Sequence, residues 1–304
     1  MLTDVRAIPP QQLNFGPGAR GFEFMQPTAE EDGCLVSERV DNPDVVANTQ
    51  AVLLSSWEHA NYGAVLLRQI PKLIRVRSLG LTHLPVVCPA SKWQLELLKV
   101  FGVTDVIGHD RGKSYAFQSL VVPSQRTSSF FFGSEVASLF DQVATSIQPR
   151  HPQIDAPLLY VSRLSQGRKK PRYRRCMNEE DLIDAVSKLG FHIFEPELHS
   201  IEEQIATFRS ARFVVGPSGA GMFNTVFCRP GIDVLSIEPL PNWIWQHCNL
   251  FGSMRHRYGF VTGGAMVDDP TPIQKSWRAD IATVVARISQ VLREIDAPAG
   301  ELMS

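Results

Sequence analysis

The stretch Phe213-Val-Val-Gly-Pro-Ser-Gly-Ala-Gly-Met-Phe-Asn-Thr-Val-Phe227 says more than any other about how this chain folds. Phe213–Val215 is typical of a short buried strand, Gly216–Gly219 of a turn, and Ala220–Phe227 of a helix. A glycine turn that leads into a helix start presents free N–H groups and the positive end of the helix dipole, which together bind anions. We expect Gly219 to let a phosphate approach the backbone and to adopt a positive φ.

One motif is excluded for this stretch, and one alternative interpretation remains open. The order Gly-x-x-Gly-x-Gly does not match the dinucleotide fingerprint Gly-x-Gly-x-x-Gly. Alternatively, the glycines serve only the packing of the strand against the helix, in which case they bind nothing.

Strands and helices alternate on both sides of this stretch. We expect strands at 51–55, 84–88, 105–108, 116–122, 158–162, 191–194, 213–215 and 234–237, and helices at 61–79, 92–101, 134–147, 179–189, 201–210, 220–227 and 281–294. Ser91 with Gln94 and Ser200 with Glu203 predict capping boxes, and Asn178 predicts an N-cap. Such alternation predicts an α/β protein with parallel, doubly wound sheets.

The chain is long enough for two domains. Three prolines between Gln148 and Pro157 predict a linker. We therefore expect two Rossmann-like domains that face a cleft, as in nucleotide-sugar transferases of the GT-B type. Residues 1–150 would form the acceptor-side domain and residues 151–304 the nucleotide-sugar-binding domain, although a fold alone does not fix a function.

Composition narrows the class of protein. A formal net charge of −1 gives no overall attraction for nucleic acid. The first thirty residues lack a signal-peptide pattern and no apolar run reaches membrane-spanning length, so we expect a cytoplasmic protein without a transmembrane segment. Five widely spaced cysteines and the lack of any Asp-x-Asp predict no disulfide framework, no metal site and no cofactor. A homo-oligomer is compatible with this composition.

Basic residues are concentrated just after the 158–162 strand. Seven of them lie within thirteen residues: Arg163, Arg168, Lys169, Lys170, Arg172, Arg174 and Arg175. Arg163 follows a strand end, where ligands of open α/β sheets bind, and a guanidinium holds a diphosphate with two hydrogen bonds. For Arg168, Lys169 and Lys170 a solvated loop is the favoured interpretation. Nucleic-acid binding is a third one, with Tyr173 as the single stacking aromatic.

Two further positions suit parts of a sugar-transfer site. Glu238 follows the 234–237 strand, where a carboxylate accepts hydrogen bonds from a ribose diol; the alternative is a solvated charge at a strand end. His59 is the candidate general base, because imidazole titrates near neutral pH. A lone histidine is more often a surface or core residue.

Several segments together resemble glycosyltransferase family 61. They are Tyr160-Val-Ser-Arg163, Arg174-Arg-Cys-Met-Asn-Glu179, Gln204, Gly219-Ala-Gly-Met-Phe-Asn224, Phe227 and Pro230-Gly231. More weakly, Asn61-Tyr-Gly-Ala-Val-Leu-Leu-Arg-Gln-Ile-Pro-Lys-Leu73 is similar to the family's Asn-Tyr-x-His-Trp-Leu segment, which implies that Asn61 and Tyr62 lie on the acceptor side. The resemblance implies a GT-B fold and inverting transfer from a nucleoside-diphosphate sugar, commonly a UDP-sugar, and points to the bacterial capsular-polysaccharide type.

The hypothesis that follows is metal-independent transfer of a sugar to a glycan or lipid-linked acceptor in polysaccharide assembly. Arg163 and Arg175 would neutralise the diphosphate beside Ser218, the N–H groups of Gly219, Ala220 and Gly221 would cradle it, and Asn224 would brace the turn. Two departures from the family, Ser218 and Ala64 where it has histidines, support an alternative. In that alternative the chain is a catalytically silent member that binds nucleotide-sugar or glycan as a scaffold.

Overall fold

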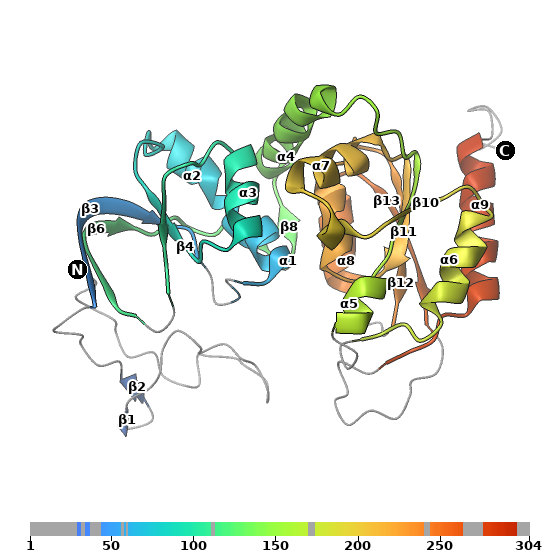
Figure 1. The fold of residues 1–304 in the computed structure, drawn as a ribbon, viewed down its shortest axis with the longest axis horizontal. Coiled ribbons are helices and arrows are strands. Elements are labelled where there is room, and N and C mark those ends of the chain that lie inside the picture. The colour runs from blue at the N-terminus through green and yellow to red at the C-terminus, as the bar shows by residue number, and fades with distance from the viewer. Residues whose placement is uncertain are drawn as a thin grey trace. The chain divides into compact units, whose positions relative to one another are not determined.

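The chain forms two compact units, Met1–Gln125 and Arg126–Ser304 (Figure 1). In this computed structural model the described residues are 29–31, 34–36, 44–55, 58, 60–110, 113–169, 174–239, 244–263 and 276–296. The boundary that the sequence predicts near residue 150 lies C-terminal to this division. Each unit is described by itself.

The first unit is built on a four-stranded parallel sheet with the strand order β5-β4-β3-β6. Its strands are β3 (Val45–Leu53), β4 (Val86–Cys88), β5 (Val106–Gly108) and β6 (Tyr115–Val121). Numbered along the chain, this order is 3-2-1-4, one half of a doubly wound sheet. Strands β1 (Ala29–Glu31) and β2 (Cys34–Val36) pair antiparallel. The parallel α/β architecture predicted from the sequence is therefore confirmed for this unit.

The helices of the first unit differ from the prediction in one place. The expected helix at 61–79 is three segments: α1 (Tyr62–Ala64), the π-helix η2 (Val65–Gln69) and α2 (Lys72–Ser78). The break falls at Pro71, whose ring and missing N–H do not fit a continuous helix. Helix α3 (Lys92–Val100) begins at the predicted capping box, in which the Gln94 side-chain oxygen accepts from the backbone N–H and the hydroxyl of Ser91.

The second unit holds a five-stranded, entirely parallel sheet with the order β10-β9-β11-β12-β13. The strands are β9 (Leu158–Val161), β10 (His192–Phe194), β11 (Phe213–Pro217), β12 (Asp233–Glu238) and β13 (Arg257–Thr262). Along the chain this order is 2-1-3-4-5, which is also doubly wound. Helices α6 (Glu179–Ser187) and α9 (Ile281–Asp296) cover one face, and α7 (Ile201–Ser210) and α8 (Ile244–Ser253) the other (Figure 1).

The remaining elements of this unit are short or lie at its border. They are the antiparallel pair β7 (Thr127–Ser128) and β8 (Phe131–Phe132), the helices α4 (Ser134–Ile147) and α5 (Leu164–Lys169), and the 3₁₀ helices η3 (Gln148–Arg150), η4 (Pro196–Leu198) and η5 (Ala220–Phe227). The core beneath α6 and α9 includes Tyr160, Phe213, Leu182, Val284 and Ile288, all fully or almost fully buried.

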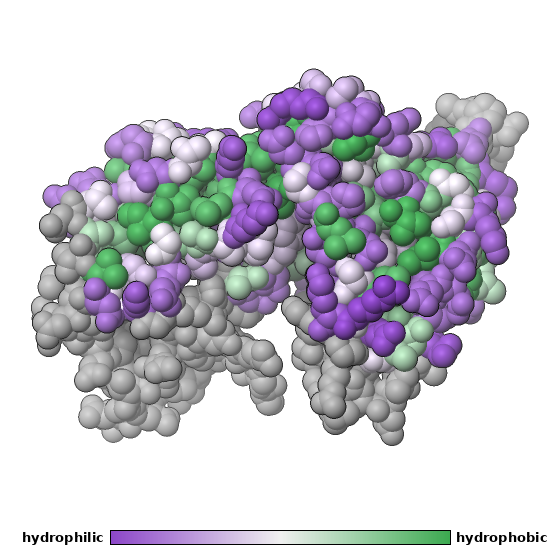
Figure 2. Space-filling model, viewed as in Figure 1, coloured by the Kyte–Doolittle hydropathy of each residue, from purple (hydrophilic) through white to green (hydrophobic). Residues whose placement is uncertain are grey.

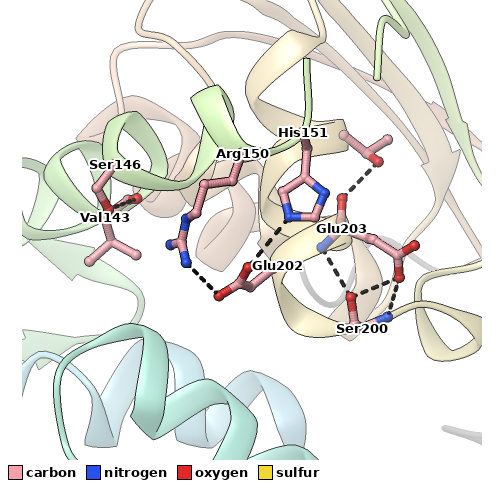
Figure 3. Close-up of polar contacts among 8 residues, drawn as sticks. Val143, Ser146, Arg150, His151, Ser200, Glu202 and Glu203 are labelled. Carbon is pink, nitrogen blue, oxygen red and sulfur yellow. Dashed lines mark hydrogen bonds and ion pairs between the residues drawn. The ribbon is translucent and has the colours of Figure 1, made fainter. Parts of the chain in front are cut away.

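The proline-rich segment and α4, the helix before it, belong to the second unit. Phe140 of α4 meets Phe227 of η5 edge to face, with 5.5 Å between ring centroids. After α4, Arg150 and His151 both contact the Glu202 carboxylate, at 3.0 and 3.4 Å (Figure 3). The residues predicted as a linker are therefore held by α7.

Two helix starts in this unit can be compared with their predictions. Ser200 and Glu203 form the predicted capping box at α7: the Glu203 N–H donates to the Ser200 hydroxyl, and the Ser200 N–H donates to the Glu203 carboxylate (Figure 3). At α6, Asn178 stands at the predicted N-cap position, but its side chain makes no capping bond. Instead it donates to the Ala279 carbonyl and accepts from the Ala279 N–H, both at 2.9 Å, and so ties two distant segments together.

Candidate functional site

The structure brings the two strongest sequence candidates to one place in the second unit. Strands β9 and β11 are neighbours, and the strands that follow them, β10 and β12, lie on opposite sides of this pair. This is the topological switch point, where open α/β sheets bind ligands beyond the carboxyl ends of their strands. Arg163 lies just beyond β9 and Ser218 just beyond β11.

Arg163 lies directly on the glycine turn. Its Nη1 donates to the Ser218 carbonyl. A Cβ added to Gly219 would stand 2.6 Å from the same nitrogen. Gly219 has a φ of 169°, an extended conformation open to any residue, so the expectation of a positive φ is wrong. A side chain here would displace the Arg163 guanidinium, which occupies that space.

The other two glycines of the motif serve packing. A Cβ on Gly216 would lie 2.6 Å from the Val161 carbonyl oxygen, and one on Gly221 would lie 3.2 Å from Val161 Cγ1. These contacts bring β11 and η5 close to β9. The packing interpretation of the motif therefore holds for Gly216 and Gly221.

The helix that starts at this turn is a 3₁₀ helix with the expected bounds. Its first turn closes with the Met222 N–H donating to the Gly219 carbonyl at 3.0 Å. The N–H groups of Ala220 and Gly221 precede this bond and have no carbonyl within the helix to bind. Both residues are partly exposed, and residues 222–228 are buried.

Asn224 braces this helix from inside. It is fully buried, and its Nδ2 donates to the Gln204 side-chain oxygen at 3.1 Å. Gln204 Nε2 in turn donates to the His199 carbonyl at 3.0 Å. Two amide side chains thus connect η5 to the start of α7, as buried polar groups require.

A small pocket lies beside Arg163. Its cavity volume is about 10 Å³, and its lining residues are Arg163, Gly167, Arg174, Arg175, Cys176, Glu179 and Pro217. Ligand pockets usually measure roughly 300–1,000 Å³, so this one would have to open before a phosphate group could enter. Three guanidinium groups and one carboxylate give it a positive formal charge.

Trp277 holds the arginines of the pocket in place. Its indole N–H donates to the Arg174 carbonyl at 3.1 Å, and its backbone N–H donates to the Arg175 carbonyl at 2.9 Å. Trp277 is almost fully buried. Arg174 has a φ of 48°, a left-handed conformation that is uncommon outside glycine. The bonds from Trp277 maintain this conformation and so orient the adjacent side chains.

Glu179 lies at the base of the pocket. It is 3% exposed, and its Oε1 accepts from the Arg163 backbone N–H at 2.6 Å and from the Ser162 hydroxyl at 3.1 Å. Burial raises the pKa of this carboxyl, and the bonds from Arg163 and Ser162 oppose the rise. The carboxylate therefore fixes the backbone from which the Arg163 side chain projects.

The rest of the basic segment divides between exposed and undescribed residues. Arg168 pairs with Glu180 at 3.0 Å, and the two side chains are 64% and 70% exposed. Hydrophilic residues cover the visible surface of α5 (Figure 2). The solvated interpretation therefore holds for Arg168, although on a short helix and not on a loop. Lys170, Arg172 and Tyr173 lie outside the described residues.

Glu238 has surroundings that the sequence did not indicate. It is fully buried, so the interpretation as a solvated strand-end charge is wrong. Its Oε1 accepts from the Ser236 hydroxyl and contacts His247 Nδ1, both at 2.6 Å, while within the described residues Oε2 has no hydrogen-bond partner. Burial alone would raise the pKa of Glu238, but the hydrogen bond and charge of His247 outweigh it and lower the pKa. This geometry does not favour direct contact between the carboxylate and a ligand.

The acceptor-side candidates lie in the first unit. The Asn61 side chain caps α1 by accepting from the Ala64 N–H at 3.2 Å. The Tyr62 ring lies 5.6 Å from the Trp93 ring, centroid to centroid. His59, the candidate base, lies outside the described residues.

The sequence missed His247 and Trp277 as parts of the site. Trp277 lies far along the chain from Arg174, which it supports, and His247 lies in the helix that follows Glu238; neither stands in a motif of its own. No local sequence pattern marks such residues.

Comparison with known protein families matches residues 40–235 to Glycosyltransferase 61. The matched range is more than half of the 304 residues and reaches into both units. The chain therefore belongs to the glycosyltransferase 61 family and is a glycosyltransferase. A search among curated proteins finds no match.

Across the described ranges, no helix is long and apolar enough to span a bilayer. Within those same ranges, no group of three or more His, Cys, Asp or Glu side chains is placed to hold a metal ion.

Proposed function

We propose that the chain is an inverting, metal-independent glycosyltransferase that takes its sugar from a nucleoside-diphosphate sugar, with UDP as the expected nucleotide. The observation that carries this proposal is the Arg163 guanidinium placed on the Gly219 turn at the switch point of the sheet. Arg174 and Arg175 line the same pocket. Membership of a family of sugar transferases and a group of three arginines at the switch point both suit the binding of a diphosphate.

The proposed chemistry has one bond broken and one formed at the anomeric carbon. An acceptor hydroxyl attacks this carbon from the face opposite the diphosphate, and a base removes the hydroxyl proton; His59 remains our candidate. The glycosidic C–O bond breaks, and its electron pair stays on the phosphate oxygen. Arg163, Arg175 and the N–H groups of Ala220 and Gly221 stabilise the charge that grows there. Cationic side chains would then do what a divalent metal does in metal-dependent transferases.

The acceptor and the setting complete the proposal. We place acceptor binding in the first unit and donor binding in the second, as in the GT-B arrangement. The acceptor would be a glycan or lipid-linked sugar of a polysaccharide assembled in the cytoplasm, as in bacterial capsular systems. Glu238 keeps its proposed role beside the ribose only if the buried carboxylate becomes accessible on binding.

Calorimetric titration with UDP and with UDP-, GDP-, CMP- and dTDP-sugars, without added metal, tests the proposal. Replacing Arg163 with Ala should weaken UDP binding by about 1.5–3 kcal/mol, the range for a hydrogen bond to a charged group. The control is Arg168→Ala, which removes an exposed arginine and should leave the affinity unchanged. Equal affinity in Arg163→Ala and the wild type, with the fold intact, would overturn the assignment.

Transfer and hydrolysis of the bound sugar nucleotide separate this proposal from the silent-member alternative. Ser218 and Ala64, in place of family histidines, are the observations that support that alternative. A chain that binds UDP-sugar but neither transfers nor hydrolyses the sugar would be a scaffold.

A further inference from the structure

Lys72 of the first unit carries a buried ammonium. Its side chain is 8% exposed, and its Nζ donates to the Ser55 carbonyl at 2.9 Å. In the part of the chain that the structure describes, no carboxylate pairs with this ammonium. A lysine ammonium has three donors, so this one has unused capacity.

A second unsatisfied group stands at the same point. The Ser55 hydroxyl is buried and has no hydrogen-bond partner among the described residues. Buried polar atoms in folded proteins are almost always bonded, so an exception needs an explanation. Ser55 thus offers a hydroxyl, and Lys72 an ammonium, at one place.

This place is where the first sheet would bind a ligand. Ser55 lies just beyond the carboxyl end of β3. Strand β3 lies between β4, the next strand along the chain, and β6, so the switch point of this sheet is at β3 and β6. Ligands of such sheets bind beyond the carboxyl ends of the strands at this point.

The backbone before Lys72 is specialised. The π-helix η2 includes a bond from the Ile70 N–H to the Val65 carbonyl, five residues back, at 3.0 Å. π-Helical turns are rare and often lie at functional sites. Pro71 is the N-cap of α2, and Lys72 is the first residue of this helix.

A purely structural role does not account for these features. A neutral donor would satisfy the Ser55 carbonyl equally well, without the cost of desolvating an ammonium. Burial lowers the pKa of Lys72, and no neighbouring charge opposes this effect. An anion beside Nζ would supply the missing counterion and would raise the pKa again.

We propose that the Lys72 ammonium and the Ser55 hydroxyl bind an anionic oxygen group, a carboxylate or phosphate, of the sugar acceptor. This inference rests on the proposed function, because it assigns the acceptor to the first unit and gives it a negative charge. A sugar acid supplies a carboxylate, and a lipid-linked or phosphorylated sugar supplies a phosphate. A carboxylate or a phosphate can accept a hydrogen bond from the ammonium with one oxygen and from the hydroxyl with another.

The test observes Lys72 itself by NMR of the full chain carrying ¹³C at lysine Cε. The chain has only eight lysines, and loss of one signal in Lys72→Met identifies the resonance. Inorganic phosphate and acetate are the probes, titrated separately at constant ionic strength. We expect one of them to move the Lys72 signal saturably and to raise its pKa, while the other seven signals do not saturate. Ser55→Ala should weaken this binding about fivefold, as loss of one hydrogen bond predicts.

Each outcome has a definite meaning. A response to phosphate alone identifies a phosphate-bearing acceptor, and a response to acetate alone identifies a carboxylate. If neither probe moves the Lys72 signal saturably, the inference is wrong. Lys72→Gln provides a second variant if Lys72→Met does not fold.

Parallel UDP titrations distinguish the failure of this inference from the failure of the proposed function. UDP binding without any Lys72 response removes the acceptor site but keeps the donor site. A Lys72 response without UDP binding in any variant leaves an anion site and removes the proposed transferase chemistry.

Discussion

The guanidinium of Arg163 takes the position that a side chain on Gly219 would occupy: a Cβ there would lie 2.6 Å from Arg163 Nη1 and 3.0 Å from Cζ. The two residues are far apart in the sequence and meet because β9 and β11 are adjacent parallel strands. The glycine and the arginine are therefore one structural unit. A substitution at either residue should change the position or the packing of the other.

Gly219→Ala should displace the Arg163 guanidinium and weaken UDP binding. The new methyl group would stand too close to Nη1, and the side chain must then leave the Ser218 carbonyl. Since φ at this position is extended, alanine fits the backbone, and the fold should be retained. We expect an affinity loss close to that of Arg163→Ala, about 1.5–3 kcal/mol by calorimetry. The double variant Gly219→Ala/Arg163→Ala should lose little more than either single one, because both remove the same contact.

Gly252→Ala is the matched control for this substitution. Gly252 lies in α8, and a Cβ there meets no atom within 4 Å. Alanine in a helix is favoured over glycine by roughly 0.5–1 kcal/mol, so this variant should be slightly more stable and bind UDP normally. Wild-type affinity in Gly219→Ala would show that the turn is merely structural.

Trp277→Phe should weaken UDP binding without touching any group that contacts the ligand. Phenylalanine keeps most of the buried ring but loses the indole N–H that donates to the Arg174 carbonyl. The left-handed backbone of Arg174 then loses one of its restraints, and the arginines of the pocket become less well positioned. We expect a loss of about 1 kcal/mol, the worth of one hydrogen bond, in calorimetric titrations. An unchanged affinity at a lowered unfolding temperature would mean that Trp277 serves the core alone.

His256 should make the second unit sensitive to acid. It is buried, its Nε2 contacts the Thr225 carbonyl at 3.0 Å, and burial lowers its pKa to about 4. Below pH 6.5, the ordinary pKa of histidine, His256 becomes protonated in the unfolded chain. In the folded chain it stays neutral until about pH 4. Stability therefore falls between these two pH values, by roughly 3 kcal/mol in total.

Urea unfolding of His256→Gln across this pH range checks the expectation. Glutamine can keep the hydrogen bond to Thr225 but does not titrate, so the loss of stability between pH 6.5 and 4 should shrink. Replacing the exposed His192 with Gln should leave the pH dependence as it is in the wild type. The same slope in both variants would assign the acid sensitivity to other groups.

Local patterns predicted the parts of the fold that depend on local interactions. The bounds of α4, α7 and η5 and the two capping boxes agree with the structure, because periodicity and end signals lie within a few residues of each other. Helix α8 and strand β13 were missed. Strand β13 lies at the sheet edge, and all but one of its residues are exposed or partly exposed. It therefore lacks the apolar run that identifies a central strand.

The site shows the same division between local and distant contributions. Arg163 and the glycine turn were found because strand ends and glycines have a recognisable sequence pattern. The sequence did not reveal why position 219 is glycine, since the reason depends on a contact across two strands. Trp277 acts through a hydrogen bond to Arg174, which is distant in the sequence, and His247 through one to Glu238 on the preceding strand; only the folded chain reveals these bonds.

Glu238→Gln tests whether this residue serves the fold or the ligand. In the fold, the carboxylate accepts from Ser236 and bonds His247, and its pKa is lowered. A lowered pKa means that Glu238 stabilises the fold above its unfolded pKa and loses this contribution as pH falls through the folded value. Glu238→Gln should therefore destabilise the protein at pH 7 by about 1.5–3 kcal/mol in urea unfolding, and the difference from the wild type should narrow in acid. Glu180→Gln, which alters an exposed ion pair, should change stability by less than about 1 kcal/mol. If Glu238→Gln instead unfolds like the wild type and binds UDP more weakly, then Glu238 contacts the nucleotide, and its role beside the ribose is restored.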